Sequence, residues 1–221
     1  DESCPITKHC QMLEAFLSKG LSVVILEKTN QLLPSFDREI TDYVENYLKS
    51  QGIFVLKEEE ISYFEKDNEN NIKKVHTASS KHIETDMIFM GIGVKPENTV
   101  AKEAGIKIGE KGGIMVDDFM RTNVSSIYAA GDCVECTDMI SENKKNFYLA
   151  SIVSKQGRIA AHNIMADIIG KSDHISYSQK DNESKYKKYP GSVATSIIKI
   201  TDIAVAKTGL SFKEAKKIYA G

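Results

Sequence analysis

Apolar residues recur at helical spacing over residues 10–20 and 37–52, and a short run of aliphatic and β-branched residues follows each stretch. The spacing predicts two amphipathic helices. The runs that follow, 21–28 and 53–56, are mostly apolar, which is typical of strands buried on both faces of a parallel sheet. Helices that alternate with such strands through short connections predict an α/β fold.

The helix predicted over 37–52 has a signal at each end. Asp37 is a typical N-cap residue, and Gly52 stands where a glycine commonly ends a helix. Its expected buried stripe consists of Ile40, Tyr43, Val44, Tyr47 and Leu48.

Beyond the second predicted strand the pattern changes. Residues 58–84 alternate around a polar turn at 67–71 and predict a small antiparallel meander. Apolar runs at 86–90 and 126–130 predict two further buried strands, the second of which ends at Gly131–Asp132.

Shorter signals complete the chain. We expect a short helix over 100–104, a strand over 114–116 and a longer helix over 155–169. The polar stretch 171–190 is typical of a linker. The residues after it predict strands and then a helix that opens on the capping box Ser211-Phe-Lys-Glu214.

Composition excludes several classes of protein. The 221 residues are 41% hydrophobic and 27% charged, which is ordinary globular usage. A net charge of −2 argues against a general nucleic-acid binder, because phosphate contacts need a basic surplus. No apolar run approaches the roughly 20 residues that span a bilayer, and we expect no signal segment. Four cysteines do not make a disulfide scaffold, so we expect a reducing, cytoplasmic setting.

The strongest chemical signal is the segment TNVSSIYAAGD, from Thr122 to Asp132. Its apolar residues predict a strand, and the small residues Ala130 and Gly131 let a ligand approach the backbone closely. Asp132 would then stand at the carboxyl end of that strand, where ligands bind in open α/β sheets. A carboxylate there suits the hydroxyl groups of a polyol. On spacing alone, an ordinary Gly-Asp turn explains these residues equally well.

A second acidic residue, Glu27, ends the strand predicted over 21–28. In a nucleotide-binding βαβ unit, an acidic residue at this point accepts hydrogen bonds from the adenosine ribose. Its charge would repel a 2′-phosphate and favour NADH over NADPH, a preference that Lys28 beside it would weaken. A strand-end glutamate that faces water is the alternative.

The cysteines and histidines give weaker signals. Cys133 and Cys136 have the C-x-x-C spacing of a thiol-redox pair, and with Cys4, His9 and Cys10 they could form a zinc site. The spacing of the two N-terminal cysteines is not standard for zinc, and buried inert thiols explain the C-x-x-C pair better. The five histidines form no metal-spaced pair, so we assign no metal site.

The TNVSSIYAAGD segment resembles the second flavin-binding motif of the pyridine nucleotide–disulfide oxidoreductase superfamily. Other segments are similar to that family in the same order, and the last of them resembles the opening of the dimerisation domain in the branch of coenzyme A disulfide reductases and NADH oxidases. These segments are Gly91 to Asn98, Gly112 to Thr122, Leu149-Ala150, Lys155 to Arg158, Thr195 to Lys199 and Ala206 to Leu210.

The resemblance implies an α/β, Rossmann-like fold that binds FAD and NAD(P), here incomplete, with the start of an α+β dimerisation domain. It places Asp132 on the ribitol chain of FAD. It also places the N-terminus of a helix near Lys155 against the flavin ring, where its partial positive charge would stabilise the anionic reduced flavin. The implied cofactor-binding residues are Glu27, Gly93, Thr122, Tyr128, Ala130, Gly131, Asp132, Leu149, Ala150 and Lys155.

The resemblance also divides the chain. It implies an NAD(P)-binding domain over 1–90 without its first strand, the C-terminal part of an FAD-binding domain over 91–170, a linker over 171–190 and the start of a dimerisation domain over 191–221. Residues 1–10 contain no glycine, so the phosphate-binding glycine loop is absent before the first helix. We therefore expect either a fragment of a family member or a chain with a defective NAD site.

The implied function is that of an FAD-dependent NAD(P)H oxidoreductase. Hydride would pass from NADH, the preferred nucleotide, to FAD, and electrons would continue to a small-molecule disulfide or to oxygen. We expect a homodimer in the intact protein and no nucleic-acid or membrane partner. We assign no catalytic residue, because the segment that carries the family's redox cysteine is not in this sequence. A non-catalytic remnant that acts as an interaction module is the alternative, and a thiol or zinc module at Cys133 and Cys136 is a weaker one.

Overall fold

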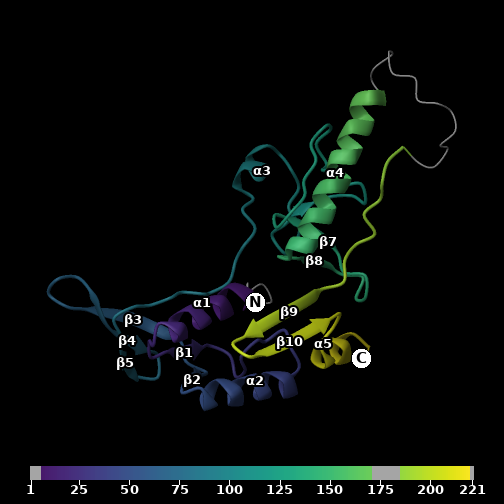
Figure 1. Ribbon diagram of the computed structural model, residues 1–221. Coiled ribbons are helices and arrows are strands. Elements are labelled where there is room, and N and C mark those ends of the chain that lie inside the picture. The colour runs from purple at the N-terminus through teal and green to yellow at the C-terminus, as the bar shows by residue number, and fades with distance from the viewer. Residues whose placement is uncertain (1–5, 171–184, 220–221) are drawn as a thin grey trace. The chain divides into compact units, whose positions relative to one another are not determined.

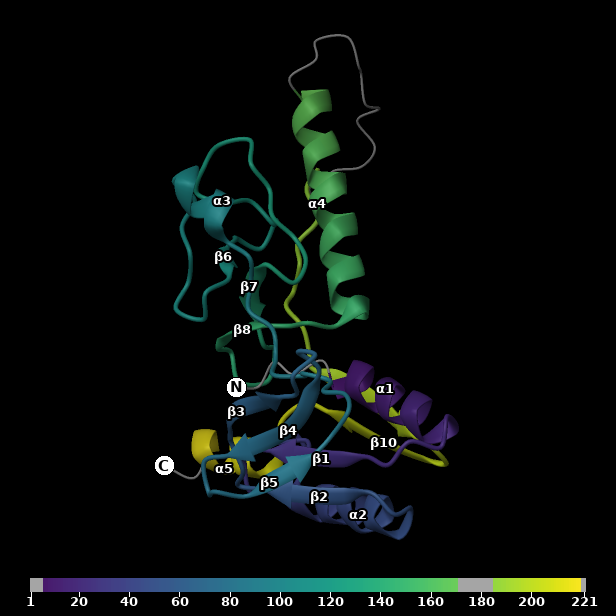
Figure 2. The same cartoon turned by 90° about the vertical axis from the view of Figure 1, so that its left-hand side faces the viewer.

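The computed structural model describes residues 6–170 and 185–219, which fall into two compact units. The first unit contains residues up to 93 together with 197–207 and 211 onward, and the second contains 94–196 and 208–210. Each unit has a buried core of its own. Figures 1 and 2 show the labelled helices and strands from two directions.

The first unit alternates helices with short strands, as the sequence predicts. Its elements, in chain order, are α1 (Ile6–Ser18), β1 (Val24–Glu27), α2 (Arg38–Ser50), β2 (Phe54–Lys57), β3 (Ile61–Lys66), β4 (Ile72–Thr77), β5 (His82–Glu84), most of β9 (Thr195–Ile200) and β10 (Ile203–Thr208), and α5 (Phe212–Tyr219).

The strand pairing confirms the parallel sheet and the meander. β1 pairs in parallel with β2, and β3, β4 and β5 form an antiparallel sheet in that order. The turn predicted at 67–71 connects β3 to β4. In it the Asp67 carboxylate accepts hydrogen bonds from the backbone N–H groups of Glu69 and Asn71, both at 2.9 Å, which is how aspartate stabilises a turn.

The core of the first unit joins residues that are far apart in the chain. The hairpin of β9 and β10 packs with α1, α2 and β2, and the backbone N–H of Thr201 donates to the Glu14 carboxylate at 2.6 Å. The capping box predicted at Ser211 forms, with its hydroxyl 2.8 Å from the Glu214 carboxylate. The buried members of the core are Leu13, Leu32, Phe36, Val44, Leu48, Ile53, Ile198, Ile200 and Val205.

The packed face of α2 differs from the predicted stripe. Ile40 and Tyr43 are 41% and 59% exposed, whereas Thr41 and Glu45 are buried beside Val44. On this rotated face the Glu45 carboxylate pairs with two lysines, Lys49 on the same helix and Lys57 at the end of β2, each at 2.7 Å. Hydrophobic spacing alone cannot anticipate a buried carboxylate that its partners neutralise.

The prediction of a buried strand at 86–90 is wrong. These residues form no strand, and Met87, Phe89 and Met90 are about half exposed. The Phe89 ring meets Phe16 of α1 edge-on, with 6.2 Å between ring centroids. An apolar run becomes a strand only beside a hydrogen-bonded neighbour, and none of the strands in the described part of the chain pairs with this segment.

The second unit contains α3 (Thr99–Glu103), β6 (Ile114–Met115), β7 (Val134–Thr137), β8 (Lys144–Asn146) and α4 (Ala150–Gly170). β7 pairs in parallel with β6 and antiparallel with β8. α4 begins five residues earlier than the predicted 155, so its N-terminus is at Ala150. Within residues 6–170 and 185–219, no helix has the length and apolarity that a membrane crossing requires.

The second apolar run, 126–130, is not a strand either. It folds back on the residues before it: the Thr122 N–H donates to the Ile127 carbonyl at 3.0 Å, and the Ala129 N–H donates to the Met120 carbonyl at 3.1 Å. This local pairing occupies the backbone groups that a longer ladder would need. The regular strand in this region, β7, follows Gly131–Asp132 instead of preceding it.

Residues 171–184 of the predicted linker lie outside the described residues. The part that follows packs against the second unit. Asn163 of α4 is fully buried, and its amide binds both backbone groups of Lys187 at 2.8 Å and the Phe119 carbonyl at 2.9 Å. Tyr189 is 5% exposed and belongs to the core of the unit.

Candidate functional site

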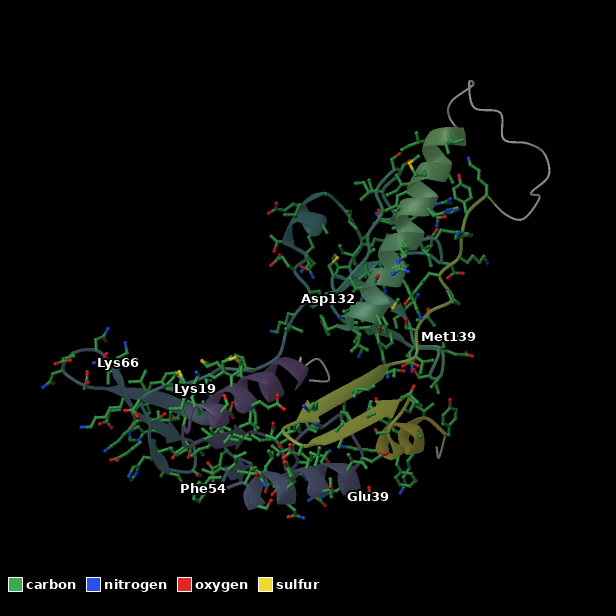
Figure 3. The ribbon with its side chains drawn as sticks, in the orientation of Figure 1. Lys19, Glu39, Phe54, Lys66, Asp132 and Met139 are labelled. Atoms are coloured by element: carbon green, nitrogen blue, oxygen red, sulfur yellow. The ribbon has the colours of Figure 1, made fainter. Side chains whose placement is uncertain are left out.

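The Gly131–Asp132 turn lies against the N-terminal part of α4. Gly131 has a φ of +105°, which favours glycine, and a Cβ built there would lie 3.7 Å from the Val153 side chain of α4. The Gly131 N–H donates to the Gln156 side chain at 2.8 Å. Figure 3 shows the labelled Asp132 beside this end of the helix.

Asp132 presents an open carboxylate. The residue is exposed, and its side chain forms no hydrogen bond or ion pair with any of the described residues. The predicted placement at the carboxyl end of a strand is wrong, because Asp132 stands just before β7, in the turn between the local hairpin and that strand. The acceptor that the sequence predicts is nevertheless present and unused by the protein, so a polyol hydroxyl could donate to it.

The helix beside this turn begins at Leu149 and Ala150. The Leu149 carbonyl accepts hydrogen bonds from the N–H groups of Ile152 and Val153, at 2.9 and 3.0 Å. Lys155 is exposed in the second turn of α4, because the helix starts earlier than predicted. The positive end of the helix dipole is therefore at Leu149–Ala150, one turn before the lysine that the sequence suggested.

Two predicted site residues have internal partners. The Thr122 hydroxyl donates to the Ile127 carbonyl at 3.0 Å, within the local hairpin. The Tyr128 hydroxyl donates to Asp167 of α4 at 2.7 Å, and burial together with this bond raises the pKa of Tyr128. Arg121 donates to the same hydroxyl at 3.3 Å. These side chains shape the segment that leads to Ala130 and Gly131.

In the first unit, Glu27 ends β1 as predicted. One carboxylate oxygen, Oε1, accepts hydrogen bonds from the N–H and hydroxyl groups of Thr29 at 2.7 and 2.8 Å. Oε2 has no hydrogen bond to the described residues, so it can accept one from a ligand. Lys28 pairs with Glu60 at 2.8 Å, so its ammonium group has a carboxylate partner other than Glu27. Gly93, with a φ of +97°, ends the first segment of this unit.

The C-x-x-C pair consists of a half-buried thiol, Cys133, and a buried one, Cys136. Burial raises the pKa of both Cys133 and Cys136, and both are free cysteines. Thiolates, the form that reacts and binds zinc, are therefore disfavoured. Across the part of the chain that the structure describes, no three His, Cys, Asp or Glu side chains are grouped to hold a metal; Cys4 lies outside that part.

Gln156 is the candidate site residue that the sequence prediction missed, and Asn163 is a second buried amide on α4 that lies away from the turn. Both are almost completely buried on α4, at 1% and 0% exposure. The signal was their spacing, because they occur on the same helical face as the buried residues Ile152, Ala160 and Ala166. Buried polar residues in such a stripe form hydrogen bonds with residues in other parts of the chain. The spacing along the helix does not identify those residues.

The parallel nucleotide-fold strands, the Gly131–Asp132 turn and the helix that starts beside it are features of FAD- and NAD-binding oxidoreductases with Rossmann-like folds. Residues 10–162 match the family model described as pyridine nucleotide-disulphide oxidoreductase, and the chain belongs to that family.

Among its relatives, a CoA-dependent NAD(P)H sulfur oxidoreductase of Pyrococcus furiosus is 32% identical over 94% of this chain and 42% of its own length. An NADH oxidase of Methanocaldococcus jannaschii is 31% identical over 91% and 40%. The solved structure of an NAD-dependent persulfide reductase from A. fulgidus matches 93% of this chain and 34% of its own with a TM-score of 0.79 and 30% identity. The chain thus spans about two fifths of the length of the curated relatives it matches.

Proposed function

We propose that this chain forms part of an FAD-dependent NAD(P)H oxidoreductase, and that Asp132 holds the ribitol chain of the flavin. The flavin, when bound, accepts hydride from the nicotinamide and passes electrons on. The observation that carries the proposal is the open Asp132 carboxylate beside the N-terminus of α4. The carboxylate offers a charged acceptor to a polyol, and the helix N-terminus offers partial positive charge to the reduced flavin ring.

The test compares Asp132→Asn with Asp118→Asn in the full-length protein. Asp118 is an exposed carboxylate of the same unit, 3.9 Å from Lys188. Loss of a charged hydrogen-bond acceptor should weaken FAD binding by roughly 10- to 100-fold at position 132 and leave it unchanged at position 118. Flavin absorbance after dialysis measures retention. A colourless but folded wild-type protein would instead support a non-catalytic interaction module.

We further propose that Glu27 makes NADH the preferred nucleotide. Its free oxygen is suited to a ribose hydroxyl, and its charge opposes a 2′-phosphate. Glu27→Ala should raise the use of NADPH relative to NADH by about tenfold or more, the size expected for removing a charge repulsion of about 1.4 kcal/mol. Glu60→Ala, which releases Lys28, should shift the ratio in the same direction. An unchanged ratio in Glu27→Ala would remove this residue from the site.

The acceptor of the electrons is proposed to be either a sulfur compound or oxygen. Support for both comes from relatives of similar identity, one named for sulfur and CoA and another as an NADH oxidase. NADH consumption by the full-length protein, measured without oxygen in the presence of coenzyme A disulfide or polysulfide and then in air without them, separates the two. We expect the intact protein to be a homodimer.

A further inference from the structure

Gln156 is a polar side chain in an apolar setting. It is 1% exposed, and the buried residues Ile152 and Ala160 lie one turn before and after it on α4. Burying an amide without partners is unfavourable, so such a residue is kept where its hydrogen bonds are made.

Both ends of the Gln156 amide have partners. Oε1 accepts the hydrogen bond from the Gly131 N–H at 2.8 Å, and Nε2 donates to the Cys136 sulfur at 3.3 Å. Only this orientation of the amide works, because the Gly131 N–H is a donor and needs the oxygen. The side chain therefore connects α4, the Gly131–Asp132 turn and β7.

Gly131 makes such a connection necessary. Its φ of +105° is open to glycine and unfavourable for other residues, yet glycine is also the residue with the greatest backbone freedom. The Gly131 N–H belongs to the Ala130–Gly131 peptide, and the next peptide is held through the Gly131 carbonyl, which accepts a hydrogen bond from the Val134 N–H at 3.2 Å. The turn that carries Asp132 is therefore held on both sides of Gly131. A fixed acceptor for the Gly131 N–H selects one orientation before any ligand binds.

We propose that Gln156 is the positioning residue of the flavin-binding turn: it holds the Ala130–Gly131 peptide, and with it the turn that presents Asp132 to the polyol. This inference rests on the proposed function for its ligand, but the hydrogen bond itself can be tested without one. Cys136 completes the arrangement, since a buried neutral thiol is a soft acceptor that satisfies Nε2 without placing a charge beside the turn.

The experiment compares Gln156→Met with Asn163→Leu in the full-length protein. Asn163 is the matched control, because it is also a fully buried amide on α4 but binds Phe119 and Lys187 rather than the turn. We expect Gln156→Met to weaken FAD binding by roughly 10- to 100-fold and to speed amide hydrogen exchange at Gly131. Asn163→Leu should lower the melting temperature while both of these readouts stay near wild type.

A conservative variant adds a rescue. Gln156→Glu keeps an oxygen acceptor for the Gly131 N–H, so slow exchange at Gly131 should be retained. Its FAD affinity should also stay nearer the wild-type value than that of Gln156→Met, because the acceptor that holds the turn is kept. Wild-type FAD affinity and slow Gly131 exchange in Gln156→Met would overturn the proposal.

The two proposals fail in different ways. If the wild-type protein binds no FAD but Gln156→Met still speeds exchange at Gly131, the positioning role stands and the flavin assignment fails. If FAD binds and depends on Asp132 but not on Gln156, the flavin assignment stands and the positioning role fails.

Discussion

Buried carboxylates occur in both units, and each is surrounded by donors. Glu45 has two lysines, Glu59 has Lys81 and the Ser79 hydroxyl, and Asp138 has a lysine and two backbone N–H groups. Burying a charge is costly unless it is paired and hydrogen-bonded. The stability of each unit therefore depends on a few specific ionised groups as well as on apolar packing.

Glu59 should make the protein sensitive to acid. Hydrogen bonds from Lys81 and Ser79 lower the pKa of Glu59 from 4.5 to about 2. A carboxyl group whose pKa is lower in the folded state stabilises the fold above its ordinary pKa, and this stabilisation is lost as the pH falls from 4.5 towards 2. Glu59→Gln should be less stable than wild type at pH 7 and should lose less stability on acidification. Denaturant midpoints from pH 7 to pH 2 measure both.

Glu60→Gln is the control for this prediction. Glu60 is the next residue along the chain and forms an exposed pair with Lys28, and such pairs contribute little. Identical acid profiles for wild type and Glu59→Gln would show that the Lys81 pairing adds nothing to folding.

Gly113 should not tolerate a side chain. Glu135 accepts hydrogen bonds from the N–H groups of Lys111 and Gly113, at 2.6 and 3.2 Å. A Cβ on Gly113 would lie 2.6 Å from the Glu135 backbone nitrogen. Gly113→Ala should therefore destabilise the second unit by about 1–3 kcal/mol.

Gly157 provides the opposite case. It lies in α4 with no atom within 4 Å of a built Cβ, so Gly157→Ala should stabilise the chain by about 0.5–1 kcal/mol through helix propensity. Urea denaturation of the two variants measures both effects. Equal stability of Gly113→Ala and wild type would mean that the loop moves aside without cost.

At the scale of elements, prediction succeeded where the deciding contacts are local. The helix α2, the β3–β5 meander and the α5 capping box all rest on residues close in sequence. The runs at 86–90 and 126–130 failed, because a strand depends on a neighbour that apolar composition does not identify. Within the described residues, no strand pairs with 86–90, and 126–130 is hydrogen-bonded to the residues just before it.

The same distinction applies to the site. Gly131 and Asp132 could be predicted as a candidate site from residue types alone, since small residues followed by a carboxylate suit the binding of a hydroxyl-bearing ligand. Gln156 could not, because its role depends on Gly131 and Cys136, which are 25 and 20 residues away.

One face of α4 should make the isolated chain self-associate. Ile164, Met165 and Ile168 lie together on this face and are 39–56% exposed, and grouped apolar surface of this kind favours association. Replacing all three with Gln should reduce light scattering at high protein concentration. Ser151→Gln, at an exposed polar position of the same helix, should leave it unchanged. Equal scattering from the triple variant and wild type would contradict the prediction.

At the scale of the whole molecule, the first unit depends on the end of the chain. Ile198 and Ile197 are neighbours on β9 with opposite orientations, 1% and 66% exposed, and Ile198 packs in the core with Phe36 and Leu48. Ile198→Ala should cost about 2–5 kcal/mol of unfolding free energy. Ile197→Ala should cost less than about 0.5 kcal/mol. Thermal unfolding compares them, and equal effects would mean that the hairpin does not support the core.

The chain leaves the first unit near residue 93 and returns to it near residue 197. In the sequence, the second unit therefore lies between two segments of the first. Recombination between homologous genes with a single crossover inside the second unit would therefore combine a nucleotide-fold unit from one parent with a closing hairpin from another. Functional chimeras should need two crossovers, one near residue 93 and one near residue 197. Ile198 and its neighbours would then come from the same parent as the core in which they pack.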